Sequence, residues 1–230
     1  MDISPDHVHV WWIGLDDHDA HRLADLYRDL GLFERRRHAD LSRRLFRNRF
    51  TVAHAALRRI LARYLDAEPS DLRLSENRWG KPALDMGVPA PQFSLSHVEG
   101  TAVLVVTRSR AVGVDIERRR ADAFTSAVAV RHFPSDEARL LARLTPTRRG
   151  AVFLRLWTRK EASVKAVGGR LADGLALPVA SGGRTLLVPC PSGGGGLLRA
   201  RDLRAPRHHA AAVALTGAAP FRVVHRYWQL

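Results

Sequence analysis

Two acidic residues lie at a spacing that suggests metal chemistry. Asp115 and Glu117 are two residues apart in VGVDIE (112–117), a segment typical of a β-strand. Side chains alternate faces along a strand, so both carboxylates are expected on one face. Neighbouring carboxylates repel each other unless a cation or water lies between them, and a hard ion such as Mg²⁺ prefers oxygen ligands of this kind. The alternative is a solvated strand end, neutralised by the arginines at 118–120.

A third acid stands among cations in FLRLWTRKEASVKAVGGRL (153–171), which is predicted to be a helix. Glu161 lies one helical turn before Lys165, a spacing that lets the two side chains meet. On an open surface this pair is ordinary and contributes about 0.2–0.5 kcal/mol. However, Trp157 shares the side of Glu161 and is expected to be buried. We therefore expect the pair at the rim of a core.

Three further residues are candidates for contact with an anion. Lys81 lies in RWGKPAL (78–84), a predicted turn whose backbone amides can also meet an anion. Ser96 and His97 lie in FSLSH (93–97), a predicted strand. Adjacent strand residues point to opposite faces, so these two are not expected to act as nucleophile and base. Their possible roles are then contact with a phosphate or packing within the fold.

The basic composition points to an anionic partner. Lys plus Arg is 37 against 23 Asp plus Glu, a formal net charge of +14, which suits nucleic acid, a phosphorylated ligand or an acidic protein. Only Lys81, Lys160 and Lys165 are lysines. An ammonium is a compact point charge and a guanidinium a broad fork, so each lysine is a candidate for a position that arginine cannot fill. The alternative is chance.

Other features narrow the class of protein. The single cysteine, Cys190, excludes an internal disulfide and offers no zinc cluster. No signal peptide is recognisable, and no apolar run approaches the roughly 20 residues of a membrane helix. A soluble cytoplasmic protein without membrane contact is expected. The histidines near the N-terminus are interpreted as surface residues rather than a metal site: His7, His9, His18 and His21.

The elements expected to position these residues mix strands and helices irregularly. The pattern predicts a first strand over 7–15, a helix over 39–65, a hairpin of strands at 93–97 and 101–107, and a helix after Pro134. Later strands are predicted in GLALPVA (174–180), RTLLVPC (184–190), AAAVALTG (210–217) and FRVVHRYW (221–228), with SGGGG (192–196) as a hairpin loop. The absence of a regular βαβ alternation favours an α+β fold.

Together these segments resemble the 4′-phosphopantetheinyl transferases of the surfactin-synthetase-activating (Sfp-type) class. The resemblance rests on RWGKPAL, FSLSH, the G-V-D-I-E strand (113–117) and, some forty residues later, the W-T-R-K-E-A-S-V-K helix (157–165). It covers roughly residues 49–178. All three lysines fall on lysine positions of the family.

The resemblance implies a reaction and its residues. A serine of an apo carrier protein attacks the β-phosphate of coenzyme A, phosphopantetheine moves to the serine, and adenosine 3′,5′-bisphosphate leaves. Asp115, Glu117 and Glu161 would hold Mg²⁺, and Lys165 would contact the phosphates; Asp115, Glu161 and Lys165 form the catalytic set. Glu161 could also accept the serine proton, directly or through water. The remaining coenzyme A ligands would be Arg49, Arg58, Lys81, Ser96, His97 and Lys160.

The resemblance also implies an architecture and a partner. Two similar α+β subdomains, 1–109 and 110–230, would be related by a pseudo-twofold axis, with coenzyme A between them, in a monomer. The carrier would be acidic and could dock on Arg118, Arg119 and Arg120; the alternative is that these arginines only solvate a loop or neutralise Glu117. Two rival functions remain: a basic nucleic-acid-binding protein without catalytic activity, and a family member that only binds coenzyme A.

Overall fold

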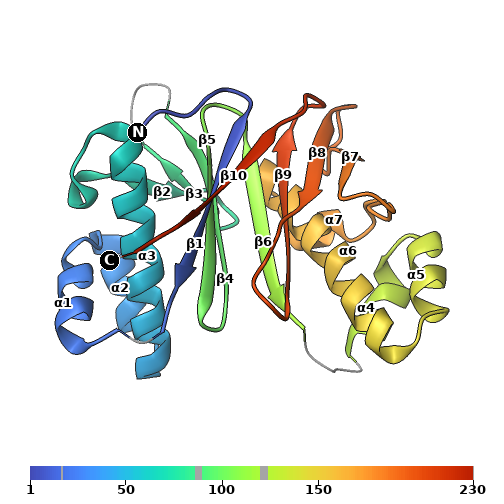
Figure 1. Cartoon of the computed structure of the whole chain (residues 1–230), viewed down its shortest axis with the longest axis horizontal. Helices are drawn as coiled ribbons and strands as arrows, with labels where there is room; N and C mark the ends of the chain where they lie inside the picture. Colours follow the sequence, from blue (N-terminus) through green and yellow to red (C-terminus); the bar gives the residue numbers. More distant parts are fainter. Residues whose placement is uncertain (17, 86–89, 120–123, 230) are drawn as a thin grey trace. The chain divides into compact units, whose positions relative to one another are not determined.

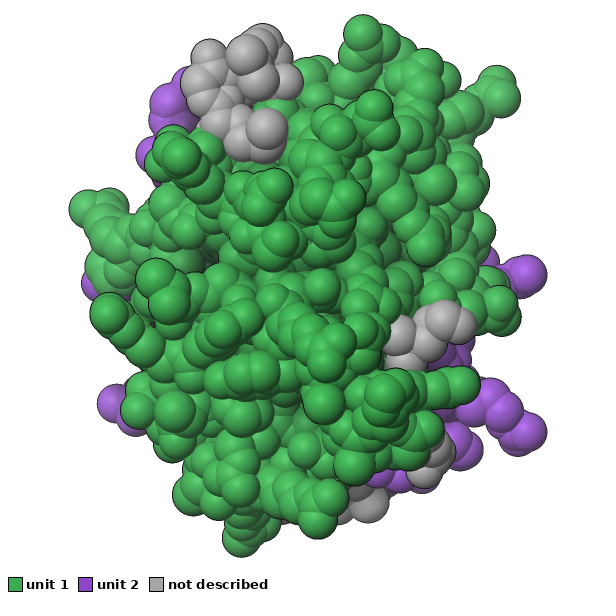
Figure 2. Space-filling model, turned by 90° about the vertical axis from the view of Figure 1, so that its left-hand side faces the viewer, with its two compact units in different colours: residues 1–109, 222–230 green, residues 110–221 purple. Residues whose placement is uncertain are grey.

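A computed structural model describes residues 1–16, 18–85, 90–119 and 124–229 (Figure 1). Helices and sheets alternate irregularly along the chain, which confirms the α+β class. The chain divides into two compact units, Met1–Ser109 with Arg222–Leu230, and Arg110–Phe221. Figure 2 colours the first unit green and the second purple.

The first unit packs two of its helices, the first and the third, against one face of a four-stranded sheet. The sheet order is β10-β1-β5-β4, with β10 parallel to β1 and the other pairs antiparallel. Its strands are β1 (His7–Gly14), β4 (Gln92–Val98), β5 (Thr101–Thr107) and β10 (Arg222–Tyr227). The helices are α1 (Ala20–Arg28), α2 (Leu32–Ala39) and α3 (Arg44–Leu65), followed by a short 3₁₀ turn η1 (Pro69–Asp71) and a hairpin of β2 (Leu74–Glu76) and β3 (Pro82–Leu84).

The second unit also sets a long helix against a sheet. Its order is β6-β9-β8-β7, and every neighbouring pair is antiparallel. The strands are β6 (Val112–Arg118), β7 (Thr185–Pro189), β8 (Leu197–Asp202) and β9 (His209–Thr216). The helices are α4 (Phe124–His132), α5 (Ser135–Ala142), α6 (Pro146–Val167) and α7 (Leu171–Gly174). The core lies between α6 and the face formed by β8 and β9, with side chains of α4 and α5 closing one side.

The two units share a local pattern. In each, a helix of 8 residues (α2 or α5) precedes a helix of 22 residues (α3 or α6). Both long helices end on a left-handed residue, Asp66 with φ 51° and Gly168 with φ 65°. A left-handed residue at this position lets the chain leave the helix while its N–H still bonds back to the last turn.

Three sequence-based predictions need correction. Residues 222–230 belong to the first unit rather than to a 110–230 subdomain, because β10 pairs in parallel with β1. GLALPVA is not a strand, since side chains of α5 and α6 bind its backbone groups, as described below. The turn predicted in RWGKPAL closes the β2–β3 hairpin, so its last residues, Pro82–Leu84, are a strand.

Candidate active site

The site is built where α6 crosses β6. Gly113 makes this crossing possible, because a Cβ on it would lie 2.1 Å from the carbonyl oxygen of Ala162 and 2.3 Å from the backbone nitrogen of Ala166. The helix backbone therefore rests directly on the strand. Asp115 and Glu117 follow Gly113 on the same face by strand alternation, so they face the same helix.

Asp115 and Lys165 meet across this crossing. The Lys165 ammonium donates to Oδ1 of Asp115 at 2.6 Å. Asp115 is buried, and about a third of the Lys165 side chain is exposed, with a relative accessibility of 32%. Burial lowers the pKa of Lys165, but the carboxylates of Asp115, Glu161 and Glu117 outweigh it and raise the pKa above its usual value. Lys165 is therefore a fixed cation among three acids.

Glu161 is strongly affected by this surrounding. Burial raises the pKa of Glu161 to about 7; Lys165 lowers it, and Asp115 and Glu117 raise it further. Near neutral pH the carboxyl group thus exchanges a proton readily, which suits a proton acceptor in catalysis. The predicted grouping of Asp115, Glu117, Glu161 and Lys165 is therefore present in the second unit.

The donor set fits a hard divalent cation, although the side chains are not arranged around one. Among the described residues, no group of three or more His, Cys, Asp or Glu side chains is placed to hold a metal ion. The ammonium of Lys165 instead lies against Asp115. Three carboxylates whose mutual repulsion contributes to the raised pKa of Glu161 form an oxygen-rich, anionic set of the kind that Mg²⁺ prefers.

Lys160 does not lie at this site, so its assignment to coenzyme A is corrected. Its side chain is 0% exposed, and its ammonium forms an ion pair with Glu137 at 2.8 Å. It also donates to the carbonyl oxygen of Leu177 and lies 4.3 Å from the ring centroid of Phe133. Adjacent helix residues point about 100° apart. Glu161 can therefore face β6 while Lys160 faces the protein interior.

Arg58 in the first unit is corrected for the same reason. The residue is 3% exposed, and its Nε donates to Glu34 at 2.5 Å. One Nη donates to the carbonyl oxygens of Pro69 and Leu72 at 2.8 and 3.1 Å. These partners occupy the guanidinium within the fold. Arg58 is thus a structural residue rather than a ligand for coenzyme A.

Lys81 lies in a loop ordered by a side-chain amide. Oδ1 of Asn77 accepts from the backbone nitrogens of Trp79 and Lys81 at 2.9 and 3.0 Å, and Gly80 takes φ 80°, which favours glycine. Burial lowers the pKa of the Lys81 ammonium to about 8. Lys81 is thus a partly buried cation in a tight turn.

The other first-unit candidates differ in exposure. Ser96 is buried and His97 is exposed, consistent with the opposite faces expected of neighbouring strand residues. Arg49 donates through Nε and one Nη to the two carboxylate oxygens of Asp16 at 2.7 and 2.8 Å. This hydrogen bonding to Asp16 raises the pKa of Arg49. Arg49 must share or exchange this partner if it binds a phosphate.

Sequence reasoning missed the residues that hold α6 in place. Glu137 is 1% exposed, and its Oε1 accepts from the backbone nitrogens of Val179 and Ala180 at 2.6 and 2.8 Å. Arg159 is 0% exposed and donates to both carboxylate oxygens of Asp202 at 2.7 and 2.9 Å. The usable signal was an acid at the third position of α5, within an otherwise amphipathic helix.

A basic strand end adjoins the site. The backbone nitrogen of Arg119 donates to the carbonyl oxygen of His208 at 2.8 Å, which extends the β6–β9 pairing beyond Arg118. The β8–β9 connection therefore lies beside Arg119, and it carries exposed Arg204 and Arg207. Arg120, the third arginine of the predicted docking set, lies outside the described residues.

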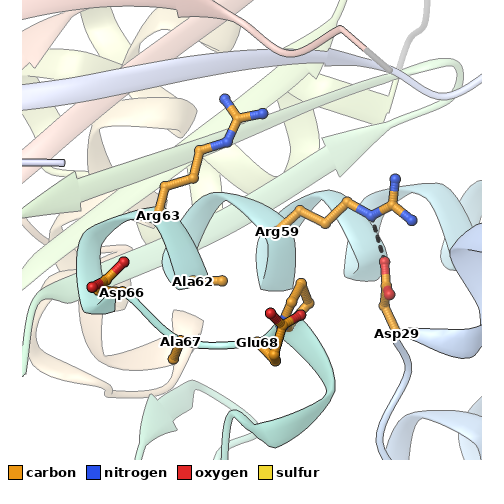
Figure 3. A pocket seen from close by; sticks show the side chains of 8 residues that line it. Asp29, Arg59, Ala62, Arg63, Asp66, Ala67 and Glu68 are labelled. Carbon is orange, nitrogen blue, oxygen red and sulfur yellow. Dashed lines mark hydrogen bonds and ion pairs between the residues drawn. The ribbon is translucent and has the colours of Figure 1, made fainter.

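An open pocket of about 650 Å³ lies on the first unit (Figure 3). Its walls come from the C-terminal turns of α3 and the segment after it, and Arg59 there is tied to Asp29 at 2.5 Å. Acids and arginines both line it: Asp29, Arg59, Arg63, Asp66 and Glu68. None of the residues proposed from the sequence lines this pocket.

None of the described helices is both long enough and apolar enough to cross a membrane.

Comparison with known proteins defines the family. Residues 111–212, which include β6 and α6, match the family model described as the 4′-phosphopantetheinyl transferase superfamily. The 4′-phosphopantetheinyl transferase HetI of Nostoc sp. is 35% identical over 178 residues, covering 76% of this chain and 73% of that protein. The corresponding enzyme psf-1 of Bacillus pumilus is 31% identical over 163 residues, covering 70% and 68%. Sfp of Bacillus subtilis is 28% identical over 134 residues, covering 58% and 56%.

The chain therefore belongs to the 4′-phosphopantetheinyl transferase superfamily. It is an enzyme, and transfer of phosphopantetheine to carrier proteins follows from this membership. The resemblance seen in the sequence is confirmed at the level of the family. The family gives no support to the nucleic-acid-binding alternative.

Proposed function

We propose that the protein transfers 4′-phosphopantetheine from coenzyme A to a serine of an apo acyl- or peptidyl-carrier protein in a Mg²⁺-dependent reaction. The serine oxygen forms a bond to the β-phosphorus, the bond from that phosphorus to the bridging oxygen breaks, and adenosine 3′,5′-bisphosphate leaves. The observation that carries the proposal is the position of Lys165 among Asp115, Glu117 and Glu161 on β6 and α6.

The residues of the site have different roles in metal binding, charge stabilisation and proton transfer. Asp115, Glu117 and Glu161 would hold Mg²⁺, which when bound would supply positive charge for the pyrophosphate. Lys165 binds a phosphate oxygen and stabilises the charge that builds up on the leaving group. Glu161 accepts the serine proton directly or through water.

The first unit would supply contacts for the nucleotide part of coenzyme A. Lys81 is the strongest candidate, because its ammonium sits in a turn whose backbone nitrogens are ordered by Asn77. Ser96, His97 and Arg49 are further proposed phosphate ligands. Arg49 would have to leave or share Asp16, so its contribution to coenzyme A affinity should be smaller than that of Lys81.

The carrier would dock at the basic strand end that follows Glu117. Arg118 and Arg119 leave β6 directly, and the β8–β9 connection beside them adds Arg204 and Arg207. A basic surface of this kind attracts an acidic carrier and speeds its association in a salt-sensitive way. Arg119→Glu should raise the KM for the carrier and leave the KM for coenzyme A much less changed. Arg36→Glu, the same charge change on exposed α2, is the control; an equal effect of both variants would contradict docking at this strand end.

The deciding experiment mixes the protein with coenzyme A, Mg²⁺ and a panel of apo carrier proteins and measures the carrier masses. Asp115→Ala and Glu161→Gln should nearly abolish the mass increase, because each removes an oxygen from the proposed ion. Normal turnover of either variant at limiting Mg²⁺ would show that the metal assignment is wrong. No modified carrier in the whole panel, together with Mg²⁺-independent binding of duplex DNA at physiological salt, would favour the nucleic-acid alternative.

A further inference from the structure

A buried ion pair fixes α6 immediately before the catalytic turn. Lys160 and Glu137 are 0% and 1% exposed at their side chains and lie 2.8 Å apart. Glu137 also accepts two backbone N–H groups, from Val179 and Ala180, while Lys160 donates to the carbonyl oxygen of Leu177. The pair thus joins α5, α6 and the segment after α7 at one point. On α6 the junction is made by Lys160, the residue directly before Glu161.

The position of this junction matters for the chemistry of α6. A carboxylate at the end of a glutamate side chain lies roughly 6 Å from its helix axis, so a helix rotation of about 10° moves it by about 1 Å. A misplacement of that size at reacting groups can lower a rate by about 10²-fold. Lys160 is locked into α5, so the rotation of α6 that presents Glu161 and Lys165 to β6 is fixed from the other side of the helix.

In the first unit, Arg58 and Glu34 form a buried pair that corresponds to Lys160 and Glu137. Arg58 lies fourteen residues after the first residue of its 22-residue helix, as Lys160 does in α6. Glu34 and Glu137 are each the third residue of the preceding 8-residue helix. Each buried cation also donates to a backbone carbonyl in the segment that follows its long helix, Arg58 to Leu72 and Lys160 to Leu177. In the first unit, the residue after the buried cation is Arg59, which pairs with Asp29 rather than facing a strand acid.

We propose that Lys160 and Glu137 are positioning residues for phosphopantetheine transfer, which hold α6 in the rotation that places Glu161 and Lys165 over Asp115 and Glu117. This inference rests on the proposed Mg²⁺-dependent function. It gives Lys160 a role through Glu161 rather than through contact with coenzyme A. The pair in the first unit shows that a buried pair at this helix position also serves the fold. Stability and positioning must therefore be separated by experiment.

The test compares Lys160→Met and Glu137→Gln with the matched variant Arg58→Met. Glu137→Gln is the mild variant, because its amide oxygen can still accept from Val179 and Ala180 while the ion pair is lost. Thermal unfolding first establishes the temperature at which all variants are folded. Below it, Mn²⁺ affinity is measured with coenzyme A present, from the electron paramagnetic resonance signal of the free ion. The kcat and the Mg²⁺ concentration for half-maximal transfer are measured in parallel.

If the buried pair positions α6, variants in the second unit should lose Mn²⁺ affinity and activity, whereas the variant in the first unit should not. All three variants should lower the unfolding temperature, but only Lys160→Met and Glu137→Gln should weaken Mn²⁺ binding and lower kcat, by at least about tenfold, as substitutions behind a metal ligand do. Lys160→Arg, which keeps the charge, should recover part of the Mn²⁺ affinity. Unchanged Mn²⁺ affinity in folded Glu137→Gln, or an equal loss in Arg58→Met, would overturn the inference. Failure of the unsubstituted protein to bind Mn²⁺ or to transfer would instead refute the proposed function.

Discussion

Gly113→Ala should damage both the fold of the second unit and the reaction. An added Cβ would lie 2.1 Å from the Ala162 carbonyl oxygen, 2.3 Å from the Ala166 nitrogen and 2.7 Å from the Lys165 carbonyl carbon. All three atoms are helix backbone, so no side-chain rotation can relieve the contact. The helix would have to move away by roughly 1 Å or more, and overpacking of this kind costs about 1–3 kcal/mol of unfolding free energy.

The same movement separates residues of the proposed site. Lys165 now donates to Asp115 at 2.6 Å, and a shift of about 1 Å takes this distance out of the usual hydrogen-bonding range. We therefore expect carrier modification to slow by about 10²-fold. Urea unfolding followed by tryptophan fluorescence gives the stability change, and the rate of the carrier mass increase gives the activity.

Gly14→Ala is the matched control, because Gly14 is also a strand glycine and a Cβ there would meet nothing within 4 Å. It should leave stability and rate close to those of the unsubstituted protein. If Gly113→Ala unfolds at the same urea concentration and modifies the carrier at the same rate as Gly14→Ala, the close packing of α6 on β6 does not position the site.

Three further predictions concern other groups. His9 is 3% exposed, and its Nδ1 is hydrogen-bonded to the Tyr64 hydroxyl at 2.6 Å. The pKa of His9 is lowered to about 4, by burial first and then by Arg226 and His7. Between pH 6.5 and 4, His9 is protonated in the unfolded chain but not in the folded protein. The free energy of unfolding is therefore highest above pH 6.5 and falls by up to about 3 kcal/mol towards pH 4. His9→Gln should flatten urea-derived stability across this range, and an unchanged pH profile would contradict the assignment. Asp202→Asn removes the charge that pairs with fully buried Arg159 and should cost about 3 kcal/mol in urea unfolding, whereas Asp136→Asn in an exposed pair should cost under about 0.5 kcal/mol; equal losses would argue against the buried pair. Lys165→Arg keeps the charge but not the compact ammonium and should lower kcat for carrier modification, while Lys81→Arg should mainly raise the KM for coenzyme A. Full activity in both would reduce the rarity of lysine to chance.

Local patterns were sufficient for the features that depend on neighbours in sequence. Strand alternation put Asp115 and Glu117 on one face, and helical spacing put Glu161 one turn before Lys165; the structure has both. The burial of Asp115 and the intermediate exposure of Glu161 agree with a site at the rim of a core. Periodicity can predict these relations because each is set by the geometry of a single element.

Relations between elements were decided only by the tertiary structure. From its place in the helix sequence, Lys160 is one more cation that could bind the phosphates of coenzyme A. The same holds for Arg58 in the first unit. Their burial follows from Glu137 and Glu34, which come from other helices and have no sequence pattern that links them to their partners. Residues 222–227 likewise follow the second unit in sequence but pair with β1, because strand pairing depends on backbone groups that every segment carries. The sequence alone therefore determined which residues could do the chemistry, and packing between elements determined which of the cations lie buried and hold the fold.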